Sequence, residues 1–162
     1  MNLLDTLNNI SKQLKRDINT SINSGGCCVV AAILASHLKN IIPYKIVVLD
    51  DGCAHIDRVR AELRNNYDIR EWNNNGVTFG HVLVEFEYGN ATYWVDSNGV
   101  HDSLVDMWYG EILSGSLTLK EATALAESSK GWCTLFNRDY IPQIDHIIEM
   151  HFNYYNVMRI AA

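Results

Sequence analysis

The chain has 162 residues, of which 48% are hydrophobic and 20% are charged, and its formal net charge is -6. A chain of this length typically forms one domain that buries roughly 70% of its unfolded surface, and this composition argues against a disordered, collagen-like or repetitive protein. The chain is acidic overall and contains no cluster of basic residues, so we expect no nucleic-acid partner.

The first two predicted elements are helices. Apolar residues recur at three- and four-residue intervals from Leu3 to Ile18, which predicts an amphipathic helix over 2–19. The same segment lacks the basic start and apolar centre of a signal peptide, so we expect no export by that route. A second helix over 27–39 is apolar nearly all round and therefore buried. Its apolar run, 27–35, is less than half the length that crosses a bilayer, so we expect no membrane partner.

A strand, a short helix and a loop are predicted next. Residues 44–49 are rich in β-branched side chains and precede the turn sequence Asp50-Asp51-Gly52, which predicts a strand. A short helix is expected over 55–64. The asparagine-rich sequence that ends at Asn75-Gly76 predicts an exposed loop.

A β hairpin is predicted from two strands, 77–88 and 91–96, that flank the turn sequence Gly89-Asn90. A two-residue turn pairs Tyr88 with Ala91 and fixes the register of the whole ladder. A three-residue loop would instead shift every side chain to the other face. In the two-residue register, the core face carries Val82, Val84, Phe86, Tyr93 and Val95.

Two further helices are predicted after the hairpin. The sequence Thr118-Leu119-Lys120-Glu121 has the pattern of a capping box and opens a helix to about residue 128. Pro142 lies near the start of an apolar stripe from Ile144 to Tyr155, which indicates a C-terminal helix.

The segment that most strongly suggests chemistry is Ser24-Gly25-Gly26-Cys27-Cys28, where a glycine pair brings two cysteines to the start of a predicted helix. A helix N-terminus carries partial positive charge and free N–H groups, which lower the pKa of a cysteine and can hold an oxyanion. Both properties serve nucleophilic thiol catalysis. Adjacent cysteines on an apolar helix are also common core residues, so a structural role stays open.

His81 interrupts an otherwise apolar strand, and the predicted register gives it a partner. Continuing the ladder places Leu83 opposite Asp96 and His81 opposite Asn98. His81 and Asp96 then become diagonal neighbours at about 7–8 Å, within reach of a hydrogen bond between their side chains. Asp96 would orient His81, and His81 would take the proton of the cysteine, as a nucleophile, base and orienter require.

These segments occur in the order of a known enzyme group. The chain resembles the transglutaminase-like branch of the papain-like cysteine protease superfamily from Gly26-Cys27-Cys28, through Ile42-Pro43 and His81-Val82-Leu83-Val84-Glu85, to Tyr93-Trp94-Val95-Asp96. The resemblance implies an α+β fold, in which a nucleophile helix packs on an antiparallel sheet that carries the histidine and the aspartate. It also implies that Cys28, two residues after Gly26, is the nucleophile, with Cys27 as the alternative.

The predicted activity is that of a thiol-dependent hydrolase, of the cysteine protease or amidase kind, which cleaves a peptide or amide bond through an acyl-enzyme on Cys28. Asn23, Ser24 and Asn98 are candidate donors to the substrate or its oxyanion. Asn98 is also an alternative orienter, because papain uses an asparagine in that role. Two other interpretations stay open: acyl transfer or transglutamination by the same triad, and a catalytically inactive protein-binding module such as a virus-encoded inhibitor.

We expect one domain over 1–162, with a motif core at 24–99 and a helical part at 100–162, because no low-complexity linker divides the chain. Four cysteines are too few for a disulfide scaffold of this length, so reduced thiols and a cytoplasmic location are expected. The ligand-type residues at 53–57 and 146–151 have no partner cluster at zinc spacing, so we expect no metal and no organic cofactor. The expected partner is a protein, peptide or amide substrate.

Overall fold

The protein is a mixed α+β structure built on one antiparallel sheet. The computed structural model describes residues 2–18, 22–23, 25–50, 55–65, 69–75, 77, 80–105, 111–128 and 136–161. Within these ranges the sheet has five strands in the order β4-β3-β2-β1-β5. The strands are β1 (Tyr44–Asp50), β2 (His81–Tyr88), β3 (Ala91–Asp96), β4 (Gly99–His101) and β5 (Glu111–Ile112). The expected α+β class is confirmed.

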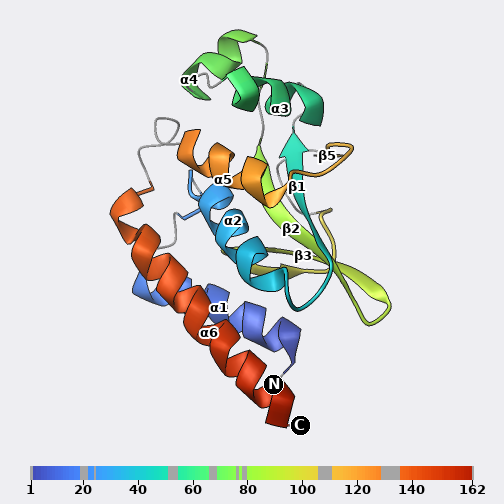
Figure 1. Ribbon diagram of the computed structural model, residues 1–162, viewed down its shortest axis with the longest axis vertical. Helices are drawn as coiled ribbons and strands as arrows, with labels where there is room; N and C mark the ends of the chain where they lie inside the picture. The colour runs from blue at the N-terminus through green and yellow to red at the C-terminus, as the bar shows by residue number, and fades with distance from the viewer. Residues whose placement is uncertain are drawn as a thin grey trace.

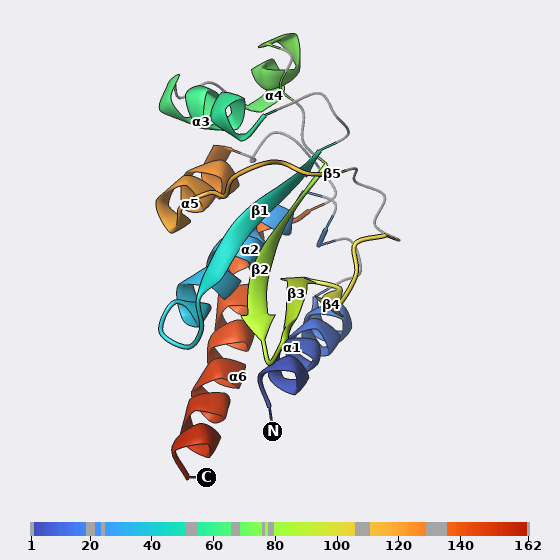
Figure 2. The ribbon, with the colours of Figure 1, turned by 90° about the vertical axis from the view of Figure 1, so that its right-hand side faces the viewer.

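The helices of the described ranges cover the sheet and one of its ends. They are α1 (Leu3–Asp17), α2 (Cys27–Leu38), α3 (Ile56–Asn65), α4 (Ile69–Trp72), α5 (Leu119–Ser128) and α6 (Ile141–Ala161), with single 3-10 turns at η1 (Asn73–Asn75) and η3 (Arg138–Tyr140). Helix α2 packs on β2 and lies between α5 and α6, with α1 alongside α6 (Figure 1). Helices α3 and α4 lie beyond one end of the sheet (Figure 2). None of the described helices is both long enough and apolar enough to span a membrane.

The two N-terminal helices form where the sequence predicts them. Asn2 caps α1 in a capping box with Asp5, which satisfies two of the N–H groups that a helix start leaves unpaired. Helix α2 is buried on nearly every side, as its apolar sequence predicts. Gly26 precedes α2 because a Cβ atom there would lie 2.5 Å from the Ile22 carbonyl oxygen and 2.9 Å from the Phe136 ring. Only glycine, which has no Cβ atom, therefore fits at this position before the cysteines.

The predicted hairpin is confirmed in its turn and register. Tyr88 pairs with Ala91, and Gly89 adopts a φ of 64°, which suits a glycine in a two-residue turn. The predicted core face is buried or packs against the core. Strand β2 begins at His81, later than predicted, because the Val77 N–H bonds to the Trp72 carbonyl 2.9 Å away and closes the preceding turn.

Three other segments differ from the sequence prediction. The expected exposed loop before Gly76 contains α4 and η1, because Trp72 is 1% exposed and draws the segment onto the core. The chain turns back after Asp96 and forms β4, which the sequence analysis did not predict. The predicted helical part at 100–162 contains α5 and α6 but also supplies β5, which pairs with β1.

Candidate active site

The side chains expected to form a triad come from three elements that meet at one end of the sheet. His81 is the first residue of β2, Asp96 is the last of β3, and the two cysteines are the first residues of α2. His81 Nε2 lies 2.7 Å from Asp96 Oδ2, and the two side chains are 0% and 2% exposed. The structure therefore brings the predicted histidine and aspartate into a buried hydrogen bond.

Asp96 is the centre of a dense hydrogen-bond network. Its Oδ2 accepts from His81 and from Asn23 Nδ2 at 3.0 Å. Its Oδ1 accepts from the Asn98 backbone N–H at 2.7 Å and from His101 Nε2 at 3.0 Å. Burial alone would raise the pKa of Asp96, but the hydrogen bonds from His101 and His81 hold that pKa well below its ordinary value. The carboxylate is therefore an anion over the physiological pH range.

His81 is a buried base with two different neighbours. Burial lowers its pKa, but hydrogen bonds to Asp96 and to the Cys27 thiol outweigh burial and raise the pKa to about 9. Because Nε2 bonds to Asp96, Nδ1 is the ring nitrogen left for the thiol. The carboxylate thus holds the imidazole in one orientation, which is what the orienter of a cysteine–histidine pair does.

The two cysteines have opposite electrostatic surroundings, and these favour Cys27 rather than the expected Cys28 as the partner of His81. The pKa of Cys27 is lowered well below its ordinary value, first by Cys28 and then, against burial, by His81. The pKa of Cys28 is raised well above its ordinary value, by Cys27 and by burial. Successive residues on a helix point about 100° apart, so only one of the two cysteines can face the histidine. The Gly-x-Cys spacing favours Cys28, whereas His81 lowers the pKa of Cys27 and is not among the groups that shift the pKa of Cys28.

The other predicted site residues have different positions. Asn23 Nδ2 donates to Asp96, and its Oδ1 accepts from Ser97 Oγ at 2.6 Å, so this side chain supports the carboxylate rather than an oxyanion. Ser24 lies outside the described residues. Asn98 does not face His81, because it lies in the turn before β4. Its side chain is exposed, and only its backbone N–H reaches Asp96.

His101 is a site residue that the sequence analysis missed. It lies on β4, opposite Trp94, and its half-buried ring donates to Asp96. The available signal was Asn98-Gly99, a common turn dipeptide, directly after Asp96. A turn there brings the following residues back along β3, whereas the sequence analysis extended the strand past Asp96.

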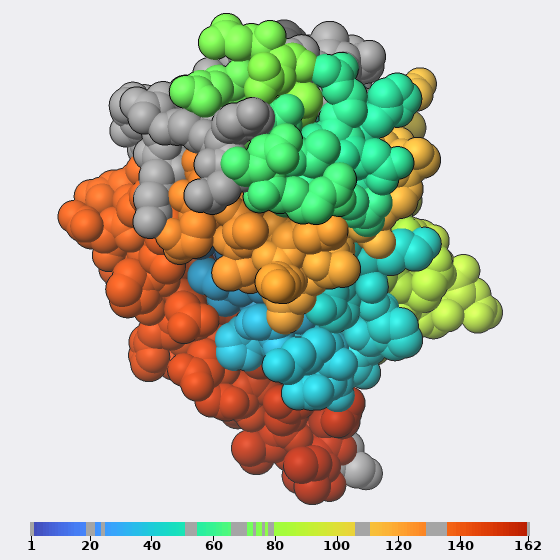
Figure 3. All heavy atoms as spheres, turned by 45° about the horizontal axis from the view of Figure 1, so that its top comes forward, coloured from blue at the N-terminus to red at the C-terminus, as the bar shows by residue number. Residues whose placement is uncertain are grey.

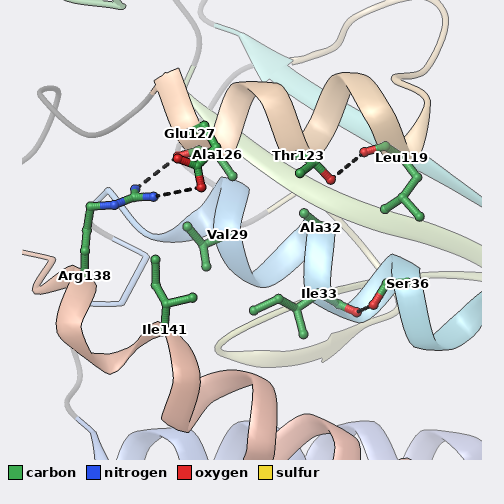
Figure 4. Close-up of a pocket in the computed structure, with 10 residues that line it drawn as sticks. All are labelled: Val29, Ala32, Ile33, Ser36, Leu119, Thr123, Ala126, Glu127, Arg138 and Ile141. Atoms are coloured by element: carbon green, nitrogen blue, oxygen red, sulfur yellow. Dashed lines mark hydrogen bonds and ion pairs between the residues drawn. The ribbon is translucent and has the colours of Figure 1, made fainter.

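A separate pocket of about 280 Å³ lies along another face of α2. Figure 3 shows that face as a strip between α5 and α6, and Figure 4 shows its lining: Val29, Ala32, Ile33 and Ser36, with Leu119, Thr123, Ala126, Glu127, Arg138 and Ile141. Ser36 and Thr123 each donate to a carbonyl of their own helix. Arg138 bonds to the Ala126 carbonyl at 3.0 Å and pairs with Glu127 at 3.7 Å. The polar groups of these lining residues are therefore already engaged, and neither Cys27 nor Cys28 is among the lining residues.

Comparisons with models of protein families, with curated proteins and with solved structures find no match for this chain. In the described residues, no group of three or more histidine, cysteine, aspartate or glutamate side chains could hold a metal ion. The chemistry of the site is therefore inferred from the arrangement of Cys27, His81 and Asp96.

Proposed function

We propose that the protein is a thiol-dependent hydrolase of peptide or amide bonds, with Cys27 as nucleophile, His81 as acid and base, and Asp96 as orienter. The observation that carries this proposal is the buried His81, which bonds to Asp96 through Nε2 at 2.7 Å and lowers the pKa of the Cys27 thiol. A nucleophile, a base and an orienter in contact are the requirements of covalent acyl chemistry.

The fold supports the same proposal. The nucleophile is the first residue of a buried helix, the histidine and aspartate lie on neighbouring antiparallel strands, and the three follow one another along the chain in that order. This is the arrangement implied by the resemblance to the papain-like superfamily. We therefore propose a papain-like core made of α2 and strands β1 to β4.

The proposed reaction begins from a Cys27 thiolate and a protonated His81. The thiolate attacks the carbonyl carbon of the scissile amide, and the N–H groups of the first turn of α2, which have no acceptor within the helix, stabilise the oxyanion. The C–N bond breaks, and His81 gives its Nδ1 proton to the leaving amine. A thioester on Cys27 remains.

Water then completes the reaction. His81, now neutral, takes a proton from a water molecule, whose oxygen attacks the thioester carbonyl. The S–C bond breaks, the acid product leaves, and the Cys27 thiolate and protonated His81 are restored. An added amine would replace this water only in an acyltransferase.

The test is turnover of a fluorogenic peptide and amide library by the wild-type protein and by the matched variants Cys27→Ala and Cys28→Ala. We expect Cys27→Ala to lower kcat by at least about 10³-fold, while Cys28→Ala keeps measurable turnover. Added amines should not divert the product. Loss of turnover in Cys28→Ala alone would reverse the assignment of the nucleophile, and equal turnover in all three proteins would exclude thiol catalysis.

The pH dependence of this turnover follows from the two shifted groups. The thiolate forms as the pH rises through the lowered pKa of Cys27, so the acid limb should lie well below the value of about 8.5 for a free cysteine. The proton for the leaving group is lost as the pH rises through the pKa of His81, about 9. We therefore expect a bell-shaped profile of kcat/KM with an alkaline limb near pH 9. A profile that rises only above pH 8.5 would contradict the thiolate–imidazolium pair.

A further inference from the structure

A second buried thiol lies directly against the proposed nucleophile. The Sγ atoms of Cys27 and Cys28 are 3.9 Å apart, and the two residues are 7% and 2% exposed. The proposed reaction uses the thiol of Cys27 alone. It gives no role to Cys28, although the Cys28 sulfur lies against that thiol.

The surroundings of the two thiols decide which one keeps its proton. Two thiolates at 3.9 Å in a buried site would repel strongly, so the pair holds one negative charge and one S–H. On the side of Cys27, the acting groups are His81 from β2 and, behind it, Asp96 from β3. On the side of Cys28 the acting charge is Arg138 of η3, whose effect on the Cys28 pKa is smaller than that of Cys27 or of burial. The negative charge therefore belongs on Cys27, and Cys28 keeps its S–H.

We propose that Cys28 is a positioning residue that donates its S–H to the Cys27 thiolate and so stabilises the thiolate in the resting enzyme. The inference rests on the proposed function, because it takes Cys27 as the nucleophile. No bond to Cys28 forms or breaks. The raised pKa of Cys28 and the lowered pKa of Cys27 agree with this assignment.

A donor to the thiolate also makes the thiolate less reactive, and this effect distinguishes it from a residue that only packs in the core. A hydrogen bond to a thiolate lowers the pKa of the thiol but also lowers the nucleophilicity of the thiolate, with a Brønsted coefficient of about 0.4–0.5. Removing the donor should therefore move the pH midpoint of thiolate formation upward and raise the rate at pH values above that midpoint. A residue that acts only through packing gives no reason for a faster plateau.

The test is the rate of Cys27 alkylation by iodoacetamide as a function of pH, with the modified residue located by mass spectrometry. Cys28→Ala removes the donor, Cys28→Val removes it with less loss of side-chain volume, and Cys28→Ser keeps a hydroxyl donor. We expect the midpoint to rise by roughly one pH unit in the alanine and valine variants, and the plateau rate to rise roughly threefold. The serine variant should keep a midpoint below that of the alanine variant.

The outcomes separate this inference from the proposed function. Unchanged midpoints in the alanine and valine variants, or a serine midpoint no lower than the alanine one, would overturn the donor role. The proposed function would survive these results if His81→Ala still abolished low-pH alkylation of Cys27. Slow alkylation of wild-type Cys27 that is indifferent to His81→Ala would instead remove the catalytic pair, and the donor role with it.

Discussion

The two ends of the β2–β3 hairpin belong to one ladder but place their polar side chains in different surroundings. At the turn end, Thr92 donates to Glu87 at 2.7 Å on the exposed surface. At the other end, His81 and Asp96 are almost fully buried. Water can replace a partner lost at the turn end, but a buried group that loses its partner keeps the full cost of desolvation. Burial, rather than hydrogen-bond length, therefore decides how much free energy of unfolding is lost when one of these contacts is removed.

The buried end is held by segments outside the hairpin. Asn23, just before α2, bonds to the Asp96 carboxylate, and Ser11 of α1 donates to the Asp96 backbone carbonyl at 3.2 Å. Asn8 of α1 accepts from the Val100 N–H at 3.0 Å and so fixes the start of β4. The N-terminal segments thus orient the carboxylate, which in turn orients His81.

The largest effect is expected from Asp96→Asn, which removes the charge at the buried end and keeps the size of the side chain. His81 loses the anion that supports its protonated form, so kcat should fall by roughly 10³-fold. The free energy of unfolding at pH 7 should fall by about 3–5 kcal/mol, as when one member of a buried ion pair is removed. Urea denaturation and turnover measure the two effects.

Unfolding measured at acid pH tests whether the effect of Asp96→Asn comes from the carboxylate charge. Because the pKa of Asp96 is lowered in the folded state, its contribution is complete above the unfolded pKa of about 3.9 and is lost as the pH falls further. The stability difference between the wild-type protein and Asp96→Asn should therefore shrink below about pH 4. A difference that stays constant down to pH 2 would show that the effect does not come from the carboxylate charge.

A smaller effect is expected from Asn23→Ala, which breaks the contact between the N-terminal segment and Asp96. The variant leaves Ser97 Oγ and one carboxylate lone pair without their partner, at a cost of about 1–3 kcal/mol in the free energy of unfolding. Asn98→Ala is the matched control, because the contact of Asn98 with Asp96 is made by its backbone. In thermal unfolding, Asn23→Ala should be less stable than Asn98→Ala. Equal losses would assign no special role to Asn23.

Part of this site was predictable from local sequence. Gly89-Asn90 sets a two-residue turn, and the strict alternation of side chains along a strand then carries the register from that turn to His81 and Asp96. Because the hairpin is a short-range structure, no knowledge of the rest of the fold was needed. The same reasoning predicted the core face of the hairpin, and the glycine pair before an apolar run predicted the helix start beside the cysteines.

The rest of the site depends on packing between distant segments. The choice between Cys27 and Cys28 depends on the rotation of α2 about its axis, and this helix follows Gly26, which packs closely against Ile22 and Phe136. His101 reaches Asp96 only through β4, a three-residue strand that is too short to have a clear periodic pattern. The spacing of apolar residues along the sequence predicts neither the rotation of α2 nor the return of the chain as β4.

The smallest effect is expected at the turn end, from Thr92→Val. This variant removes the hydroxyl that donates to Glu87 at 2.7 Å, a bond no longer than the one between His81 and Asp96. Both partners at the turn end lie in contact with water, and valine keeps the shape and strand preference of threonine. The free energy of unfolding should therefore change by less than about 0.5 kcal/mol, with kcat and the alkylation midpoint of Cys27 unchanged. A loss as large as that of Asn23→Ala would mean that hydrogen bonds along this ladder contribute equally whether buried or exposed, and the distinction between its two ends would fail.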